Sequence, residues 1–325
     1  MSTSTPRTFV PLSHQALPPV DMSIPPWPGE VREAGGLRLH VRVTPGPKTG
    51  DAPTAIYVHG LGGSATNWTD LAGQLSGHVH GIAVDLPGFG RSEPTREFDY
   101  SLPAHADALA AFVRGLDAGP VHLFGNSMGG AIAMLFAARH PDLVRTLTLV
   151  SPAVPDLRPF VSRVSDPRLP LAFLPAIGSV VRRRLAAEPV ELRVMRLMRL
   201  VFADASRVPD TRLAEAAEEF AERERMVWAS PALARSTIGL FRAWLVPKAK
   251  SLWTIAPRIK APTLVVWGAD DKLVTVRKAP RITRLLPRGR LLVLPRTGHV
   301  AQMERPGTVA RAVVGMWEQV DSGEW

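Results

Sequence analysis

The fold is decided by one stretch, Val121-His122-Leu123-Phe124-Gly125-Asn126-Ser127-Met128-Gly129. Its first four residues predict a buried strand, and the apolar segment Met128–Arg139 that follows predicts a helix. Gly-x-Ser-x-Gly lies between them, and its small residues let a strand and a helix approach closely on either side of Ser127. Such a tight turn strains the backbone of the serine and exposes its hydroxyl above the edge of the sheet. The stretch therefore predicts a nucleophile at a strand-to-helix junction.

Short β-favouring runs alternate with helical patterns on both sides of this junction. The predicted strands are Leu37–Val43, Thr54–His59, His80–Asp85, Val121–Asn126, Thr146–Ser151, Thr263–Gly268 and Leu291–Pro295. The predicted helices are Leu102–Arg114, Met128–Arg139, Val276–Leu286 and Pro306–Val320. The later strands are apolar on both faces, which is typical of a parallel sheet covered on both sides. The alternation predicts an α/β fold with a mostly parallel sheet.

The alternation stops over residues 152–257, where helical patterns occur and no convincing strand does. Arg193, Arg196 and Arg199 recur every three residues and so share one stripe of a helix, and 211–228 predicts a second helix. We interpret 152–257 as a helical cap between two parts of a core, 31–151 and 258–325. Residues 1–30 are rich in proline and predict an extended arm, which Trp27 would pin to the body.

The composition excludes several classes of protein. The formal charge is +10, but the basic residues are scattered and no nucleic-acid-binding motif accompanies them, so we expect no nucleic-acid partner. The absence of cysteine excludes disulfides, thiolate metal sites and cysteine nucleophiles. Prolines interrupt the N-terminal segment, which argues against a signal peptide, and no apolar run is long enough to span a bilayer. We expect a cytoplasmic protein; the oligomeric state stays open.

A serine hydroxyl needs a base, and only two histidines follow the junction, His140 and His299. His140 ends the helix that Ser127 begins, so it lies about 18 Å away at 1.5 Å per residue. His299 follows the last predicted strand and is the expected base. The acid that would orient it comes after the preceding strand, and we expect Asp271, which stands three residues beyond Gly268. Asp270 is the alternative.

An oxyanion hole requires backbone N–H groups directed at the developing negative charge. Met128, the residue after the nucleophile, would supply one. Leu61 would supply the other from the loop His59-Gly60-Leu61-Gly62-Gly63, in which Gly60 and Gly62 would line the substrate site. A phosphate-binding loop is a poorer interpretation, because the lysine of the G-x-x-x-x-G-K-[ST] motif is missing.

These motifs, together with Asp85-Leu86-Pro87-Gly88-Phe89-Gly90-Arg91-Ser92, resemble the α/β-hydrolase superfamily over residues 30 to 320. The resemblance implies an eight-stranded sheet, a cap over the site, and neither a metal nor an organic cofactor. Relatives that open epoxides or displace halide use aspartate at the position of Ser127. A serine there implies attack on a carbonyl and an acyl-enzyme, and we expect the substrate to be a carboxylic ester.

The histidine loop, residues 298–304, also resembles those of monoacylglycerol lipases and of hydrolases that cleave carbon–carbon bonds of ring-cleavage products. In the latter relatives a cap arginine and an aromatic residue after the histidine contribute, and Val300 departs from that pattern. Acyl transfer, cofactor-free perhydrolysis and a non-catalytic ligand sensor stay open. The arginine stripe of the cap is compatible with a solvated face, with binding of an anionic substrate group, or with contact to an anionic membrane.

Overall fold

The structure is a computed structural model, and it describes residues 9–48, 52–156, 180, 183–184 and 187–325. Its centre is an eight-stranded sheet in the order β1-β2-β4-β3-β5-β6-β7-β8. The strands are β1 (Gly29–Ala34), β2 (Leu37–Thr44), β3 (Thr54–Val58), β4 (His80–Val84), β5 (Val121–Asn126), β6 (Val144–Val150), β7 (Thr263–Gly268) and β8 (Gly289–Leu294). The pairs from β4 to β8 are parallel, whereas β1 pairs with β2 and β2 with β4 antiparallel. The predicted α/β fold with a mostly parallel eight-stranded sheet is confirmed.

Helices cover both faces of the sheet, because successive residues of each buried strand point to opposite sides. On one face, Ile56 and Leu123 join the core beneath α2 (Leu102–Gly115), α3 (Met128–Arg139), α8 (Leu252–Ile255) and α9 (Ala279–Leu285). On the other, Tyr57 and Phe124 pack beneath α1 (Thr69–Leu75), α10 (Ala301–Glu304) and α11 (Pro306–Asp321). The predicted helix 276–286 is a 3₁₀ turn, Val276–Lys278, followed by α9.

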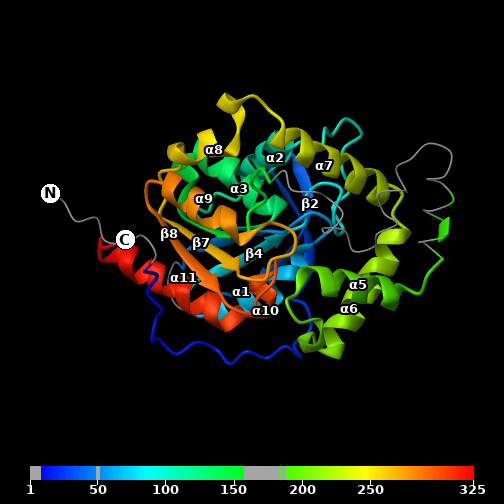
Figure 1. Cartoon of the computed structure of the whole chain (residues 1–325), viewed down its shortest axis with the longest axis horizontal. Coiled ribbons are helices and arrows are strands. Elements are labelled where there is room, and N and C mark those ends of the chain that lie inside the picture. Colours follow the sequence, from blue (N-terminus) through cyan, green and yellow to red (C-terminus); the bar gives the residue numbers. More distant parts are fainter. Residues whose placement is uncertain (1–8, 49–51, 157–179, 181–182, 185–186) are drawn as a thin grey trace.

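The described part of 152–257 is helical and contains no strand. It holds α5 (Val190–Val201), α6 (Asp210–Glu224) and α7 (Ala229–Trp244), followed by α8. Figure 1 shows α5 and α6 grouped to one side of the sheet, with α7 running from them back towards α2 and α8. A separate apolar cluster, which includes Val194 and Met198, joins α5 to α6. Leu252 and Ala256 belong to the main core, so packing on the sheet resumes before residue 258.

The N-terminal arm runs along the outside of the second helical layer (Figure 1) and reaches the cap. The Ser13 hydroxyl donates to Glu318 on α11 at 2.6 Å, and the Trp27 indole donates to the carbonyl of Thr69 on α1 at 2.9 Å. Farther along, Arg212 on α6 donates to the carbonyl of Ile24. The arm ends where β1 begins at Gly29, so the last two residues of the range predicted to be an extended arm belong to this strand. No helix among the described residues is long and apolar enough to cross a membrane.

Candidate active site

Ser127 occupies the turn between β5 and α3 with φ 54° and ψ −118°, a conformation that side chains rarely adopt. Its N–H donates to the carbonyl of Val150 on β6, and its carbonyl accepts from the N–H of Ala153 at 2.8 Å. The glycines on either side of Ser127 are required because neighbouring backbone leaves no room for a side chain, as well as by the tight turn. A Cβ on Gly125 would lie 2.4 Å from the carbonyl oxygen of Gly129, and one on Gly129 would lie 2.3 Å from that of Val58. Backbone contacts on three sides therefore hold the serine in its strained position.

His299 and Asp271 meet at the neighbouring strand ends. The His299 Nδ1 lies 2.8 Å from Asp271 Oδ2, and both side chains are buried. The other carboxylate oxygen accepts from the N–H groups of Leu273 and Val274 at 2.8 and 2.9 Å, which holds the carboxylate in place. Asp270 is exposed and does not make this contact. The His299 Nε2 is buried and has no hydrogen-bond partner among the described residues.

Asn126, the residue before Ser127, connects the histidine loop to the serine turn. Its side-chain amide donates to the carbonyls of His299 and Val150, each at 3.1 Å. On its other side, the N–H of His299 donates to the carbonyl of Val201, the last residue of α5, at 2.7 Å. The loop is therefore held between the sheet and the cap. His140 lies at the far end of α3, where it contacts Arg114.

The loop after β3 lies against Ser127. A Cβ on Gly60 would come within 3.1 Å of the Ser127 Cβ, and Gly62 has φ 72°. The N–H groups of Leu61 and Met128 make no hydrogen bond to any described residue; Met128 is the first residue of α3, where N–H groups have no partner within the helix. The α3 dipole adds a partial positive charge beside Ser127. All seven residues expected at the site thus lie at one edge of the sheet.

A buried network of histidine and carboxylate side chains supports the loop after β3. His59 contacts the carbonyl of Gly60 through Nδ1 at 2.7 Å and accepts from the N–H of Leu86 through Nε2. Burial lowers the pKa of His59, so its ring is neutral, with the proton on Nδ1. Burial alone would raise the pKa of Asp85, but hydrogen bonds from His40, Arg91 and Ala65 lower it. Asp85 therefore anchors the end of the loop at Ala65 as a carboxylate.

Three charged side chains join the cap to these loops, and no local motif in the sequence marks them. Arg223 on α6 donates to the carbonyl of Gly62. The Glu304 carboxylate accepts from the N–H groups of Gly298 and Ala203 at 2.7 and 3.2 Å. The Lys272 ammonium donates to the carbonyls of Arg199 and Phe202 at the C-terminal end of α5. Each bridges segments tens of residues apart, so only the folded chain brings them together.

The arginine stripe of α5 is largely engaged within the cap. Arg193 forms an ion pair with Glu224 on α6, and Arg196 forms one with Glu188. Arg199 is exposed. Val300, the residue after the histidine, packs into the cap cluster, which explains an aliphatic side chain at that position. Among the described residues, no group of three or more His, Asp or Glu side chains has the arrangement of a metal site.

Comparisons with known proteins agree with this geometry. The chain is 28% identical over 270 residues to a 2-hydroxy-6-oxononadienedioate/2-hydroxy-6-oxononatrienedioate hydrolase of Cupriavidus pinatubonensis, covering 81% of this chain and 86% of that protein. It is 26% identical over 290 residues to the monoacylglycerol lipase abhd6-B of Xenopus laevis, covering 85% and 78%. The crystal structure of a putative lipase (lip1) from Acinetobacter baumannii superposes with a TM-score of 0.73 at 24% identity over 91% and 92% of the two chains, a likeness of fold alone. The family model described as alpha/beta hydrolase fold matches residues 53–306, and the chain belongs to that family of hydrolases.

Proposed function

We propose that Ser127, His299 and Asp271 form the catalytic triad of this hydrolase. The observation that carries the proposal is the state of the His299 ring. Its Nδ1 is bound to a buried carboxylate at 2.8 Å, its Nε2 has no partner among the described residues, and its loop is hydrogen-bonded to the residue before Ser127. Asp271 then keeps the proton on Nδ1 and leaves Nε2 free to accept the serine proton.

In this proposal Ser127 attacks a substrate carbonyl while His299 takes its proton. The resulting oxyanion accepts hydrogen bonds from the N–H groups of Leu61 and Met128, beside the surfaces of Gly60 and Gly62. Fixed backbone donors of this kind stabilise the transition state without reorganising, and one of them contributes about 3 kcal/mol in other hydrolases. His299 returns the proton to the leaving group, and water then releases the acyl group from Ser127 by the reverse sequence.

We further infer that the bond cleaved is the carbon–carbon bond of an acidic, conjugated diketone. The dienedioate hydrolase of Cupriavidus pinatubonensis, named for such a substrate, supports this over the ester that the sequence alone favoured. Arg223 adds a physical argument. Its guanidinium donates to the carbonyl of Gly62 and is paired with Glu219 at 3.5 Å. A cation at this loop suits a substrate carboxylate better than it suits a neutral ester.

Ester hydrolysis is the second candidate, and a specific observation favours it. The monoacylglycerol lipase relative matches the chain at almost the same identity as the dienedioate hydrolase. Val300 also lacks the aromatic ring that the carbon–carbon hydrolases place after the histidine. The two reactions share the acyl-enzyme and differ in the leaving group, because a departing carbon needs conjugation to carry its electron pair until it is protonated.

Two measurements test these proposals separately. A fluorophosphonate probe should label the wild-type protein and not Ser127→Ala; a folded wild-type protein that is not labelled would favour a non-catalytic sensor. Next, kcat/KM is compared for 2-hydroxy-6-oxononadienedioate, p-nitrophenyl acetate and a monoacylglycerol. We expect the dienedioate to be the best substrate. Fast turnover of the esters alone would make the second candidate correct.

The role of Arg223 is tested by the ratio of two specificity constants. Arg223→Gln should lower the kcat/KM for the dienedioate relative to that for p-nitrophenyl acetate by about tenfold, mainly through KM, because a charged hydrogen bond to carboxylate is lost. Arg207→Gln is the matched control, since Arg207 is an exposed cap arginine at a distance from Gly62 whose ion pair is with Asp204. An unchanged ratio in Arg223→Gln would remove this residue from substrate binding.

A further inference from the structure

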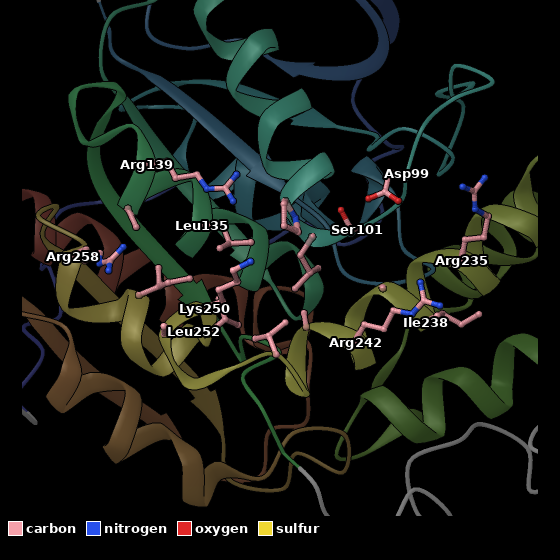
Figure 2. A pocket seen from close by; sticks show the side chains of 18 residues that line it. Asp99, Ser101, Leu135, Arg139, Arg235, Ile238, Arg242, Lys250, Leu252 and Arg258 are labelled. Carbon is pink, nitrogen blue, oxygen red and sulfur yellow. The ribbon is translucent and has the colours of Figure 1, made fainter.

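A pocket of about 760 Å³ lies between α7 and the helices on one face of the sheet. Its walls come from α2, α3, α7 and α8 with the residues around α8, and Figure 2 shows the side chains that line it, with Arg139 and Arg258 on one side and Arg235 and Arg242 on the other. None of the seven residues expected at the active site lines it. The volume falls within the range of about 300–1,000 Å³ that is usual for small-molecule sites.

The floor of this pocket is apolar. Leu102 from α2, Leu135 from α3 and Leu252 from α8 line it, and all three are buried members of the main core. Ile238 on α7 also lines the pocket and is 47% exposed. A hydrocarbon chain laid on this surface would remove apolar area from water, at about 25 cal/mol per Å².

The rim is strongly basic. Five cationic side chains line the pocket against one acid, Asp99; the five are Arg139, Arg235, Arg242, Lys250 and Arg258. On α7 the lining residues Arg235, Ile238, Gly239, Arg242 and Ala243 follow helical spacing, so one stripe of this helix faces the pocket. The charge is therefore concentrated by the fold and does not merely reflect the net charge of the chain.

Three of the five cations have neither an ion pair nor a ring contact among the residues that the structure describes. Arg139 forms an ion pair with Asp107 at 2.7 Å, and the guanidinium of Arg235 lies 4.6 Å from the centre of the Tyr100 ring. Arg242, Lys250 and Arg258, by contrast, make no ion pair or side-chain hydrogen bond with any residue that the structure describes. Like charges gathered around one space repel each other, and an anion bound among them would relieve that repulsion.

We propose that this pocket binds an amphiphilic anion. Its carboxylate or phosphate head group lies at the basic rim that Arg242, Lys250 and Arg258 help to form, and its acyl chain covers Leu102, Leu135 and Leu252. An inorganic anion would satisfy the cations and leave the floor in water, and a neutral lipid would do the reverse. The same head-group and chain chemistry occurs in a free fatty acid and in an anionic lipid of a bilayer, which the experiment distinguishes.

A ligand in this pocket would contact a helix that also supports Ser127. The opposite face of α7 carries Trp244, whose indole donates to the carbonyl of Ala153 at 3.0 Å. The N–H of Ala153 donates in turn to the carbonyl of Ser127 at 2.8 Å. Binding is nevertheless expected whether or not the protein hydrolyses esters or diketones, because none of the pocket residues belongs to the proposed triad.

The test measures binding of laurate below its micellar concentration, together with photocross-linking of a diazirine-bearing laurate mapped by mass spectrometry. The double variant Arg242→Gln/Lys250→Gln should bind laurate about tenfold or more weakly, a loss of about 1.4 kcal/mol. Arg288→Gln/Lys48→Gln removes the same two charges from exposed positions outside the pocket and should bind as the wild type does. Cross-links should map to peptides that contain Ile238 or Leu252.

Two ligand controls and one vesicle arm complete the test. Acetate, which lacks the chain, and dodecanol, which lacks the charge, should each compete poorly with laurate. Vesicles of phosphatidylglycerol that bind the wild type but not the double variant would identify a bilayer lipid as the source, and laurate binding without vesicle binding would identify a free amphiphile. Equal laurate affinity in both double variants, equal competition by dodecanol, or cross-links confined to other peptides would overturn the proposal.

Discussion

The edge of the sheet at Ser127 and the pocket beside α7 hold charged groups in opposite ways. At the edge, the hydrogen-bonded side chains of Asp271 and His299 are buried, and backbone N–H groups fix the carboxylate. Glycines pack there so closely that a single added carbon would strike a neighbouring backbone. Beside α7, the cations are exposed and three of them have no partner among the described residues. The first region is positioned by backbone contacts for chemistry, whereas the second is open to a ligand that supplies the missing charge.

The largest effect is expected from Ser127→Ala at the edge. Removing the nucleophile should lower kcat by about 10⁵-fold or more, because no other group can form the acyl-enzyme. Initial rates on the best substrate of the three above measure this loss, and circular dichroism checks that the fold is kept. A variant that retains a tenth of the activity would show that Ser127 is not the nucleophile. The edge of the sheet would then no longer be the region that carries the chemistry.

Asp271→Asn, compared with Asp270→Asn, tests which of the two adjacent carboxylates at the edge of the sheet orients His299. Loss of the carboxylate should lower kcat by about 10⁴-fold, since the imidazole would no longer be held in the tautomer that accepts the serine proton. Asp270→Asn changes an adjacent, exposed carboxylate in the same way and should alter kcat by no more than about twofold. Comparable losses in the two variants would mean that the acid has been assigned to the wrong residue.

Arg212→Met measures how much the buried ion pairs between the cap and the core contribute to stability. Arg212 on α6 is buried, and it pairs with Asp70 on α1 at 2.6 Å and with Glu215 at 2.7 Å. Removing it leaves the carboxylate of Asp70 buried without a partner, which should cost about 3 kcal/mol of stability. Urea denaturation measures the loss, and Asp70→Leu/Arg212→Met should recover most of it. Failure of the double variant to recover would place the cost in lost packing.

Gly298→Ala tests the packing between the histidine loop at the edge of the sheet and the end of α5 in the cap. A Cβ there would lie 2.4 Å from the carbonyl oxygen of Val201 and 2.6 Å from the nitrogen of Ala203, so the end of α5 must move. We expect a loss of about 1–3 kcal/mol in stability from overpacking, and a lower kcat because His299 follows directly. Gly77→Ala, whose new carbon would meet nothing within 4 Å, is the control and should be nearly neutral. Equal stability of the two variants would show that the loop yields freely.

Sequence patterns predicted the edge far better than the cap. Ser127, His299 and Asp271 follow strands, so strand order and chain order alone place them at one edge of a parallel sheet. β1 escaped prediction because it is an exposed edge strand with the polar sequence Gly29-Glu30-Val31-Arg32-Glu33. Arg223 and Glu304 escaped because they act on carbonyl and N–H groups that every residue carries. The identity of such partners is set by the tertiary fold and leaves no local pattern.

The smallest effect concerns the seam between core and cap, where α2 meets α7. His105 is buried there, and its Nε2 lies 3.4 Å from the Ser236 hydroxyl. Burial lowers the pKa of His105 to about 3. In the unfolded chain this ring takes up a proton near pH 6.5, whereas in the folded chain it stays neutral until about pH 3. Stability from this group is therefore present above pH 6.5 and is lost as the pH falls towards 3.

His105→Phe should remove this dependence. The wild type should lose up to about 1.4 kcal/mol per pH unit through His105 over that interval, and the variant should show a shallower slope in urea denaturation. Hydrogen exchange locates the effect: in the wild type, amides of α7 should lose protection on acidification before those of β5, because α7 is held through this seam. His122, which is buried on β5 and whose pKa burial likewise lowers to about 3, provides the control. His122→Phe should flatten the dependence of global stability on pH without protecting the amides of α7 from exchange. If both variants protected the α7 amides alike, acid would act on the whole fold and the contact between α2 and α7 would have no special role.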